Sequence, residues 1–157
     1  MVKKGFITCL LFVAMFMLCV SYVYANSSGV TAQGEAWGYE YTATEINDTS
    51  TWKIGHKGDT YTIEETKERA PFLIDFMNAV ERVDSQQSRL GLFGAYLLVT
   101  VIVALILYRK NKPMFKKAIG IFSVLAGVAL YFIVMTSLDL NTALEDAHFY
   151  FEKLKNM

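Results

Sequence analysis

Few side chains in this sequence are suited to chemistry, and they are widely spaced. His56 and Asp59 share one predicted turn, and His148, the other histidine of the chain, lies near the C-terminus. Histidine and carboxylate side chains bind metals or transfer protons, but a zinc site of the usual kind needs four ligands at set spacings. We interpret His56 as a solvated turn residue and His148 as a helix-surface residue, and the pair Glu64–Glu65 as part of a solvated charged face.

Cysteine chemistry and common catalytic motifs are also missing from the sequence. Cys9 and Cys19 both lie in the first apolar block, and neither follows the small residue that a lipid-attachment motif requires. The sequence contains no glycine-rich phosphate loop, nucleophile elbow or HExxH helix. We therefore predict a protein that is not an enzyme and that has no catalytic residue, no metal site and no cofactor. A membrane enzyme with an outer active site is the weakest alternative.

The apolar residues are concentrated in three blocks that contain no charged residue. They make up 54% of the chain, above the roughly 45–50% of soluble domains. The blocks cover residues 5–24, 90–108 and 118–138, and each approaches the length of about 20 residues that spans a bilayer. Lys3 and Lys4 precede the first block and Val23-Tyr24-Ala25 ends it, which predicts a signal peptide over residues 1–25. An uncleaved anchor is the alternative.

The second and third blocks predict two transmembrane helices joined by a short basic loop, residues 109–117. This loop contains Pro113, no acidic residue and five basic ones: Arg109, Lys110, Lys112, Lys116 and Lys117. Short loops rich in lysine and arginine stay in the cytoplasm. We therefore expect an integral protein of the plasma or inner membrane, with both mature termini extracytoplasmic. The net charge of zero gives no reason to expect a nucleic acid partner.

Both predicted spans contain small residues at spacings that favour helix packing in lipid. Close approach of helices in a bilayer depends on such side chains. The candidate packing residues are Gly91, Gly94 and Ala95 on the first span, and Gly120, Ser123 and Gly127 on the second. We expect them to pack the two spans against each other. The alternative is that they dock onto another membrane protein.

The segment 26–89 combines strand-like alternation with one amphipathic helix. Aromatic and aliphatic residues alternate with polar ones in three stretches, which predicts a three-stranded antiparallel sheet with a four-residue loop over residues 56–59. One face of the sheet carries Trp37, Tyr39, Tyr41, Trp52 and Tyr61, together with Ile54 and Ile63. This face is either core or an interaction surface for a partner protein or glycan.

Two helices are predicted to flank this sheet in space. Pro71 suits a first helical turn, and the apolar residues that follow are Leu73, Phe76, Met77, Val80 and Val83. With no breaker before residue 90, this helix forms a stalk that continues into the membrane. The tail, residues 139–157, has Leu140, Leu144, Ala147, Phe151 and Leu154 at helical spacing. Thr142 and Glu145 predict a capping box at its start. We expect the tail to pack on the stalk rather than lie on the bilayer.

Together these features predict an α+β membrane protein: a signal peptide, a small outer sheet with a helix, a transmembrane hairpin and an outer C-terminal amphipathic helix. Such a small outer module has a marginal core of its own. We therefore expect a non-enzymatic envelope protein that binds or assembles with a larger membrane or extracytoplasmic partner. The alternative is a homo-oligomeric structural subunit, either of a pore or of a pilin-like fibre.

Overall fold

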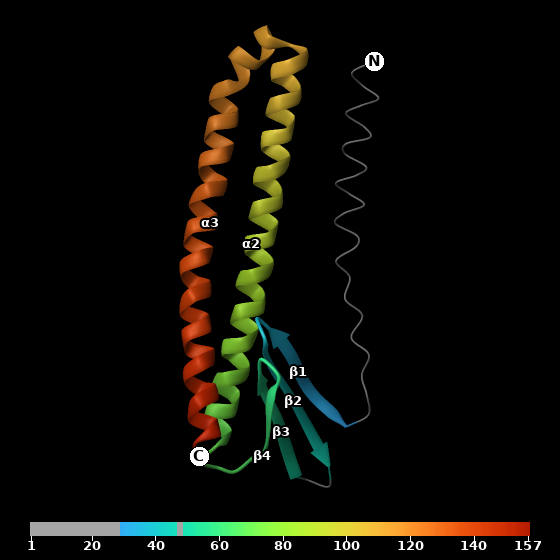
Figure 1. Cartoon of the computed structure of the whole chain (residues 1–157), viewed down its shortest axis with the longest axis vertical. Coiled ribbons are helices and arrows are strands. Elements are labelled where there is room, and N and C mark those ends of the chain that lie inside the picture. The colour runs from blue at the N-terminus through green and yellow to red at the C-terminus, as the bar shows by residue number, and fades with distance from the viewer. Residues whose placement is uncertain (1–28, 47–48) are drawn as a thin grey trace.

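The computed structural model describes residues 29–46 and 49–157. The predicted signal peptide and both cysteines lie outside the described residues. Two long antiparallel helices, α2 (Ala70–Lys110) and α3 (Lys112–Lys155), form a hairpin, and a sheet lies against one end of it (Figure 1). We call residues 70–83 and 140–155 the sheet end of the hairpin, and residues 90–108 and 118–138 its apolar section.

The connection between the helices is tighter than the predicted loop over residues 109–117. Asn111 alone separates α2 from α3, and its Oδ1 accepts a hydrogen bond from the backbone N–H of Met114 at 3.2 Å. Pro113 lies in the first turn of α3 instead of interrupting a helix. Proline is tolerated there because the first N–H groups of a helix have no intrahelical acceptor.

The sheet is antiparallel, as predicted, but it has four strands rather than three. The strands β1 (Val30–Ala36), β2 (Tyr39–Ile46), β3 (Thr49–His56) and β4 (Asp59–Glu64) lie in the order β1-β2-β3-β4. The prediction missed β1, whose inward positions include Ala32, Gly34 and Ala36. Gly34 has no room for a side chain, since a Cβ there would lie 2.5 Å from Cε1 of Tyr41 on the next strand.

Two-residue turns close the first and last hairpins of the sheet. Trp37-Gly38 has φ values of 50° and 80°, and Lys57-Gly58 has 52° and 97°. Positive φ at both central residues is the mark of a type I′ turn. The predicted four-residue loop is therefore wrong, because His56 and Asp59 are paired strand residues. Trp37 also lies in a turn and not on the predicted strand face.

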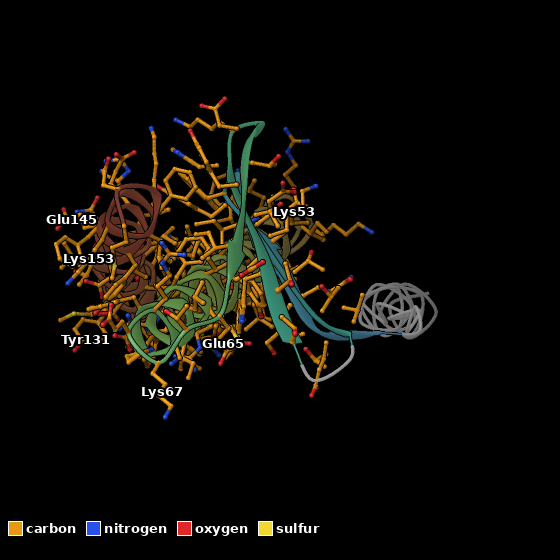
Figure 2. All side chains as sticks on the ribbon, turned by 90° about the horizontal axis from the view of Figure 1, so that it is seen from below. Lys53, Glu65, Lys67, Tyr131, Glu145 and Lys153 are labelled. Carbon is orange, nitrogen blue, oxygen red and sulfur yellow. The ribbon has the colours of Figure 1, made fainter. Side chains whose placement is uncertain are left out.

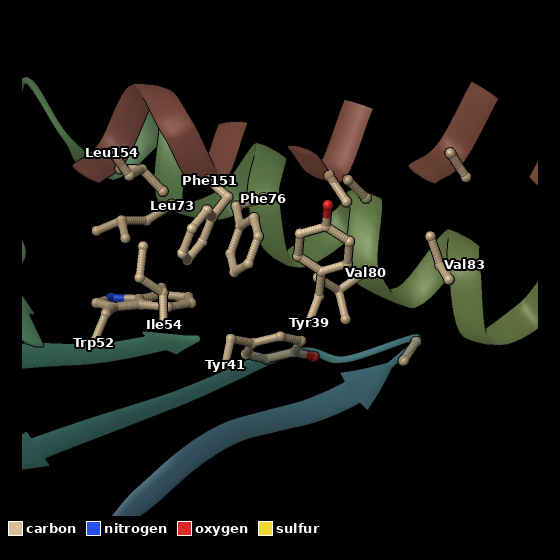
Figure 3. Packing of buried hydrophobic residues seen from close by; sticks show 14 of the residues in the cluster. Tyr39, Tyr41, Trp52, Ile54, Leu73, Phe76, Val80, Val83, Phe151 and Leu154 are labelled. Atoms are coloured by element: carbon tan, nitrogen blue, oxygen red, sulfur yellow. The ribbon is translucent and has the colours of Figure 1, made fainter. Parts of the chain in front are cut away.

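The inward face of the sheet packs against the sheet end of both helices (Figure 3). The Phe151 ring of α3 lies at the centre of this core, with ring centroids 6.2 Å from Tyr39 and from Phe76 and 5.9 Å from Tyr61. The predicted apolar faces of the stalk and the tail supply the rest of the core. Leu73, Phe76, Val80, Val83, Leu140, Ala147, Phe151 and Leu154 are buried, and Met77 and Leu144 are partly buried.

Both helices continue from the sheet end into the apolar section without a break. This confirms the prediction for α2, but the predicted start of a separate helix at residue 139 is wrong. The Thr142 hydroxyl donates to the carbonyl oxygen of Leu138 at 3.3 Å, a bond of the helix interior and not a cap. No glycine or proline follows Gly127, so nothing in the sequence ends the helix between the span and the tail.

The apolar section makes both helices long and apolar enough to cross a membrane. In each helix the most apolar 18-residue window is only 6% buried within the structure. A long apolar helix in the core of a soluble protein is mostly buried instead. These two windows are therefore apolar on the outside of the molecule.

Candidate interaction surfaces

Three of the five aromatic residues proposed for a binding surface lie in the core. Tyr39, Tyr41 and Trp52 are 5%, 3% and 7% exposed and lie between the sheet and the helices (Figure 3). The Tyr41 hydroxyl donates to Oε1 of Glu81 at 2.9 Å, and Trp52 Nε1 donates to Oε2 of Glu65 at 2.8 Å. A partner could not reach these three side chains unless the sheet separated from the helices.

The other two aromatic residues are accessible to different extents. Tyr61 is half-buried against Phe151. Trp37 is 55% exposed, because the two-residue turn directs it away from the core. Of the predicted aromatic face, Trp37 is therefore the residue that most fully presents its ring to the surroundings.

The two histidines meet where the sheet contacts α3. The His56 ring stacks on Tyr39 at a centroid distance of 4.1 Å and an interplanar angle of 4°, and the His148 ring lies 6.1 Å from His56. Burial lowers the pKa of His56, and Lys57 and His148 lower it further, while Asp59 and Glu152 act in the opposite direction. Burial raises the pKa of Tyr39, and Glu152 adds to this shift.

This histidine pair has the geometry of a packing contact. Among the described residues, no group of three histidine, cysteine, aspartate or glutamate side chains converges to hold a metal ion. A shallow hollow beside His148 is lined by α3 residues alone, including Glu145, Phe149, Glu152 and Lys153. The hollow is formed by one face of a single helix and is not enclosed.

In the apolar section, α2 and α3 contact each other through residues that the sequence analysis did not select. Thr100, Ala129 and Thr136 are 8%, 2% and 5% exposed. The Thr100 hydroxyl is satisfied within its own helix, donating to the carbonyl oxygen of Tyr96 at 2.9 Å. The Phe93 and Phe132 rings stack across the hairpin at 5.0 Å. The buried and half-buried residues of α3 in this section recur every three or four positions, and this spacing is visible in the sequence.

The predicted small packing residues do not form the contact between α2 and α3, which corrects that expectation. A Cβ built on Gly91, Gly94, Gly120 or Gly127 would have no described atom within 4 Å outside its own helical turn. Ala95 and Ser123 are exposed. Gly127 lies about 160° round the helix from the buried Ala129, because each residue turns an α-helix by about 100°. Gly94 is half-buried, and the other five small residues are exposed and face outward.

Large apolar side chains surround these small residues on the outside of the apolar section. Val124, Ile121 and Leu98 are 66%, 64% and 60% exposed. Tyr131, on the same face of α3 as Gly127, also points away from α2 (Figure 2). The outside of the apolar section is therefore apolar around its glycines.

Charged side chains lie at the two ends of the hairpin. The predicted topology-determining residues Arg109, Lys110, Lys112, Lys116 and Lys117 are all at the end opposite the sheet, and all are exposed. Charges of both signs, including Lys53, Lys67 and Glu145, project outward around the sheet end (Figure 2).

Comparisons of the chain with protein-family models, with curated proteins and with solved structures give no match.

Proposed function

We propose that this chain is a non-enzymatic integral membrane protein of the cell envelope that assembles with a larger membrane partner. In this proposal α2 and α3 cross the bilayer as a hairpin, with the basic end in the cytoplasm and the sheet end and both mature termini outside. The exposed apolar windows support insertion, and the basic cluster at one end supports this orientation.

The observation that carries the assembly proposal is the outward direction of the small residues. In a bilayer, helices associate where small side chains let their backbones approach. Such a step occurs at Gly91–Ala95 on α2 and at Ser123–Gly127 on α3, and the hairpin uses neither. A helix from another chain would fit against either face, and the four-residue spacing of each step matches the contact that small residues form.

The test is purification of the full chain from its native membrane in mild detergent, followed by native mass measurement. We expect a co-purifying membrane protein at fixed stoichiometry. Replacing Gly120 and Gly127 by leucine should remove it, because the new side chains fill the approach surface. The matched control is Val128→Leu, which enlarges an exposed residue outside the small-residue face. A chain that is always monomeric would contradict the proposal.

A homo-oligomeric structural subunit, such as a pore or a pilin-like fibre subunit, is the second candidate. It is favoured by the presence of a small-residue step on each helix, since a ring or fibre needs two different contact faces on every copy. The same mass measurement separates the candidates. Multiples of the chain's own mass would support the oligomer, and a foreign chain would support the partner.

A further inference from the structure

We propose that the end of the sheet nearest the apolar section docks onto the headgroup layer of the bilayer. This docking surface consists of the turns Trp37-Gly38 and Lys57-Gly58, and the two are joined, since the Lys57 N–H donates to the Gly38 carbonyl oxygen at 2.8 Å. The inference rests on the membrane insertion proposed above. It adds a second contact between the protein and lipid, made by the sheet and not by the helices.

The position of the turns relative to α2 brings them close to the membrane. Strand β1 packs on α2 and runs in the same direction, toward the apolar section, and its turn lies beside Val83 (Figures 1 and 3). Leu90, where the uncharged stretch begins, is seven residues further along, or about 10 Å at the rise of an α-helix. A headgroup layer is roughly 5–8 Å thick on each side of the bilayer. A tryptophan side chain at the turn can bridge the remaining distance.

The residues at the two turns are unusual for the backbone they occupy. Trp37 and Lys57 both have positive φ, where asparagine, aspartate or glycine is normally found in a type I′ turn. A bulky residue in this left-handed region carries a conformational cost, and residues of this kind persist mainly where their side chains have a use. In each turn the non-glycine residue with positive φ, Trp37 or Lys57, has an exposed side chain.

The chemistry of this pair matches a lipid headgroup region better than a protein. Tryptophan is enriched at the membrane–water interface, where its ring is partly apolar and its N–H finds an acceptor, and lysine pairs with lipid phosphate. Arg89, exposed at the border of the apolar section, adds a second cation on the same side. Two short turns present far less surface than the roughly 1,000 Å² expected of a specific protein interface. The acidic residues Asp59 and Glu40 lie nearby and offset the charge of Lys57. We therefore expect the Trp37 indole to contribute more to lipid binding than the net charge of the surface does.

Tryptophan fluorescence tests the proposal in the full chain reconstituted into phosphatidylcholine vesicles. The chain contains two tryptophans, and Trp52 is buried, so the Trp37→Phe variant reports the Trp52 background without disturbing the core. With lipids brominated near the headgroups, we expect quenching to fall at least about twofold in Trp37→Phe, because the interfacial indole is gone. Equal quenching in both proteins, with Trp37 open to aqueous acrylamide, would overturn the docking.

Carbonate extraction of the same vesicles separates this inference from the proposed anchor. If the chain resists extraction but Trp37 shows no lipid quenching, the membrane hairpin is supported and the docking of the sheet is overturned. If the chain is extracted, both the membrane hairpin and the docking of the sheet are overturned. The Lys57→Gln variant, which keeps a long side chain at the turn, should retain most Trp37 quenching in phosphatidylcholine. When anionic lipid is added, it should gain less quenching than the wild type, because it has lost the phosphate-pairing charge.

Discussion

The two parts of the α2–α3 hairpin arrange large and small side chains in opposite ways. At the sheet end, large residues such as Leu73 and Phe76 are fully buried. In the apolar section, the buried contact is made by smaller residues, Thr100, Ala129 and Thr136, while Val124 and Leu98 lie outside. The buried side chains therefore include large ones at the sheet end and only small ones in the apolar section.

The difference follows from what covers each part of the hairpin. The sheet supplies a third layer at one end, so that large side chains from both helices can be enclosed. No described element covers the apolar section, so its large side chains meet the surroundings. An exterior that is apolar over the length of a bilayer is stable in lipid and not in water.

The largest expected effect is at the centre of the sheet-end core. Replacing Phe151 by alanine should lower the free energy of unfolding by about 3–5 kcal/mol, because it leaves a cavity among Tyr39, Tyr61 and Phe76. Phe149→Ala, two residues away on α3 and 59% exposed, should change it by no more than about 0.5 kcal/mol. Denaturant unfolding in detergent, followed by Trp52 fluorescence in a Trp37→Phe background, measures both. Equal losses would mean that the core is not where we place it.

A charge on the outside of the apolar section tests the other side of the comparison. Val124→Lys should reduce membrane insertion by at most about 2.5–3.5 kcal/mol, the range for lysine at the centre of a spanning helix, because Val124 lies four residues from the middle of the block 118–138. Thr62→Lys, on the outer face of β4, should have no effect. The measurement is the carbonate-resistant fraction of each protein after expression. If Val124→Lys instead yielded more soluble, folded protein, the apolar section would be adapted to water.

Acidification should weaken the contact between the sheet and α3 at a smaller scale. The pKa of His56 is lowered below its usual value of 6.5 by burial and by nearby Lys57 and His148. The unfolded chain therefore binds the proton more readily, and stability falls as the pH drops from above 6.5 through the lowered pKa. The melting temperature should fall over this range and level off below it. His56→Gln should flatten this dependence, and an unchanged slope would contradict the assignment.

The smallest effect is expected at the ion pair that joins the helices on the surface of the sheet end. Arg82 Nη2 and Asp146 Oδ2 lie 2.9 Å apart, with side chains 55% and 40% exposed. Pairs this accessible contribute about 0–1 kcal/mol. A double-mutant cycle with Arg82→Ala and Asp146→Ala should give a coupling energy in this range that shrinks in high salt. A coupling above 2 kcal/mol would show that charge, and not burial, holds this end together.

Much of the helical architecture could be predicted because its signals are local. The absence of a breaker between Pro71 and the second apolar block is visible in the sequence, and α2 is continuous. The apolar faces of the stalk and tail follow from helical spacing, and most of their members are buried. The capping box predicted from Thr142 and Glu145 does not mark the start of a separate tail helix, since a threonine three residues before a glutamate can also lie inside a helix.

The features that were missed depend on contacts between distant residues. Strand β1 has glycine at position 34 because the Tyr41 ring occupies the space over it, and no local pattern in the sequence shows this contact. The outward direction of Gly120 and Gly127 depends on which face of α3 meets α2, and helical spacing alone offers several faces. Trp37 looked like a strand residue because a type I′ turn rarely holds tryptophan.

The absence of any joint within α2 or α3 has a mechanical consequence. The 41 residues of α2 form a rod about 60 Å long, and α3 runs beside it for a similar distance. The sheet is clamped to one end of this pair of rods by its core. A tilt or rotation applied at the basic end would therefore reach the sheet through two helices that have no break between the two ends.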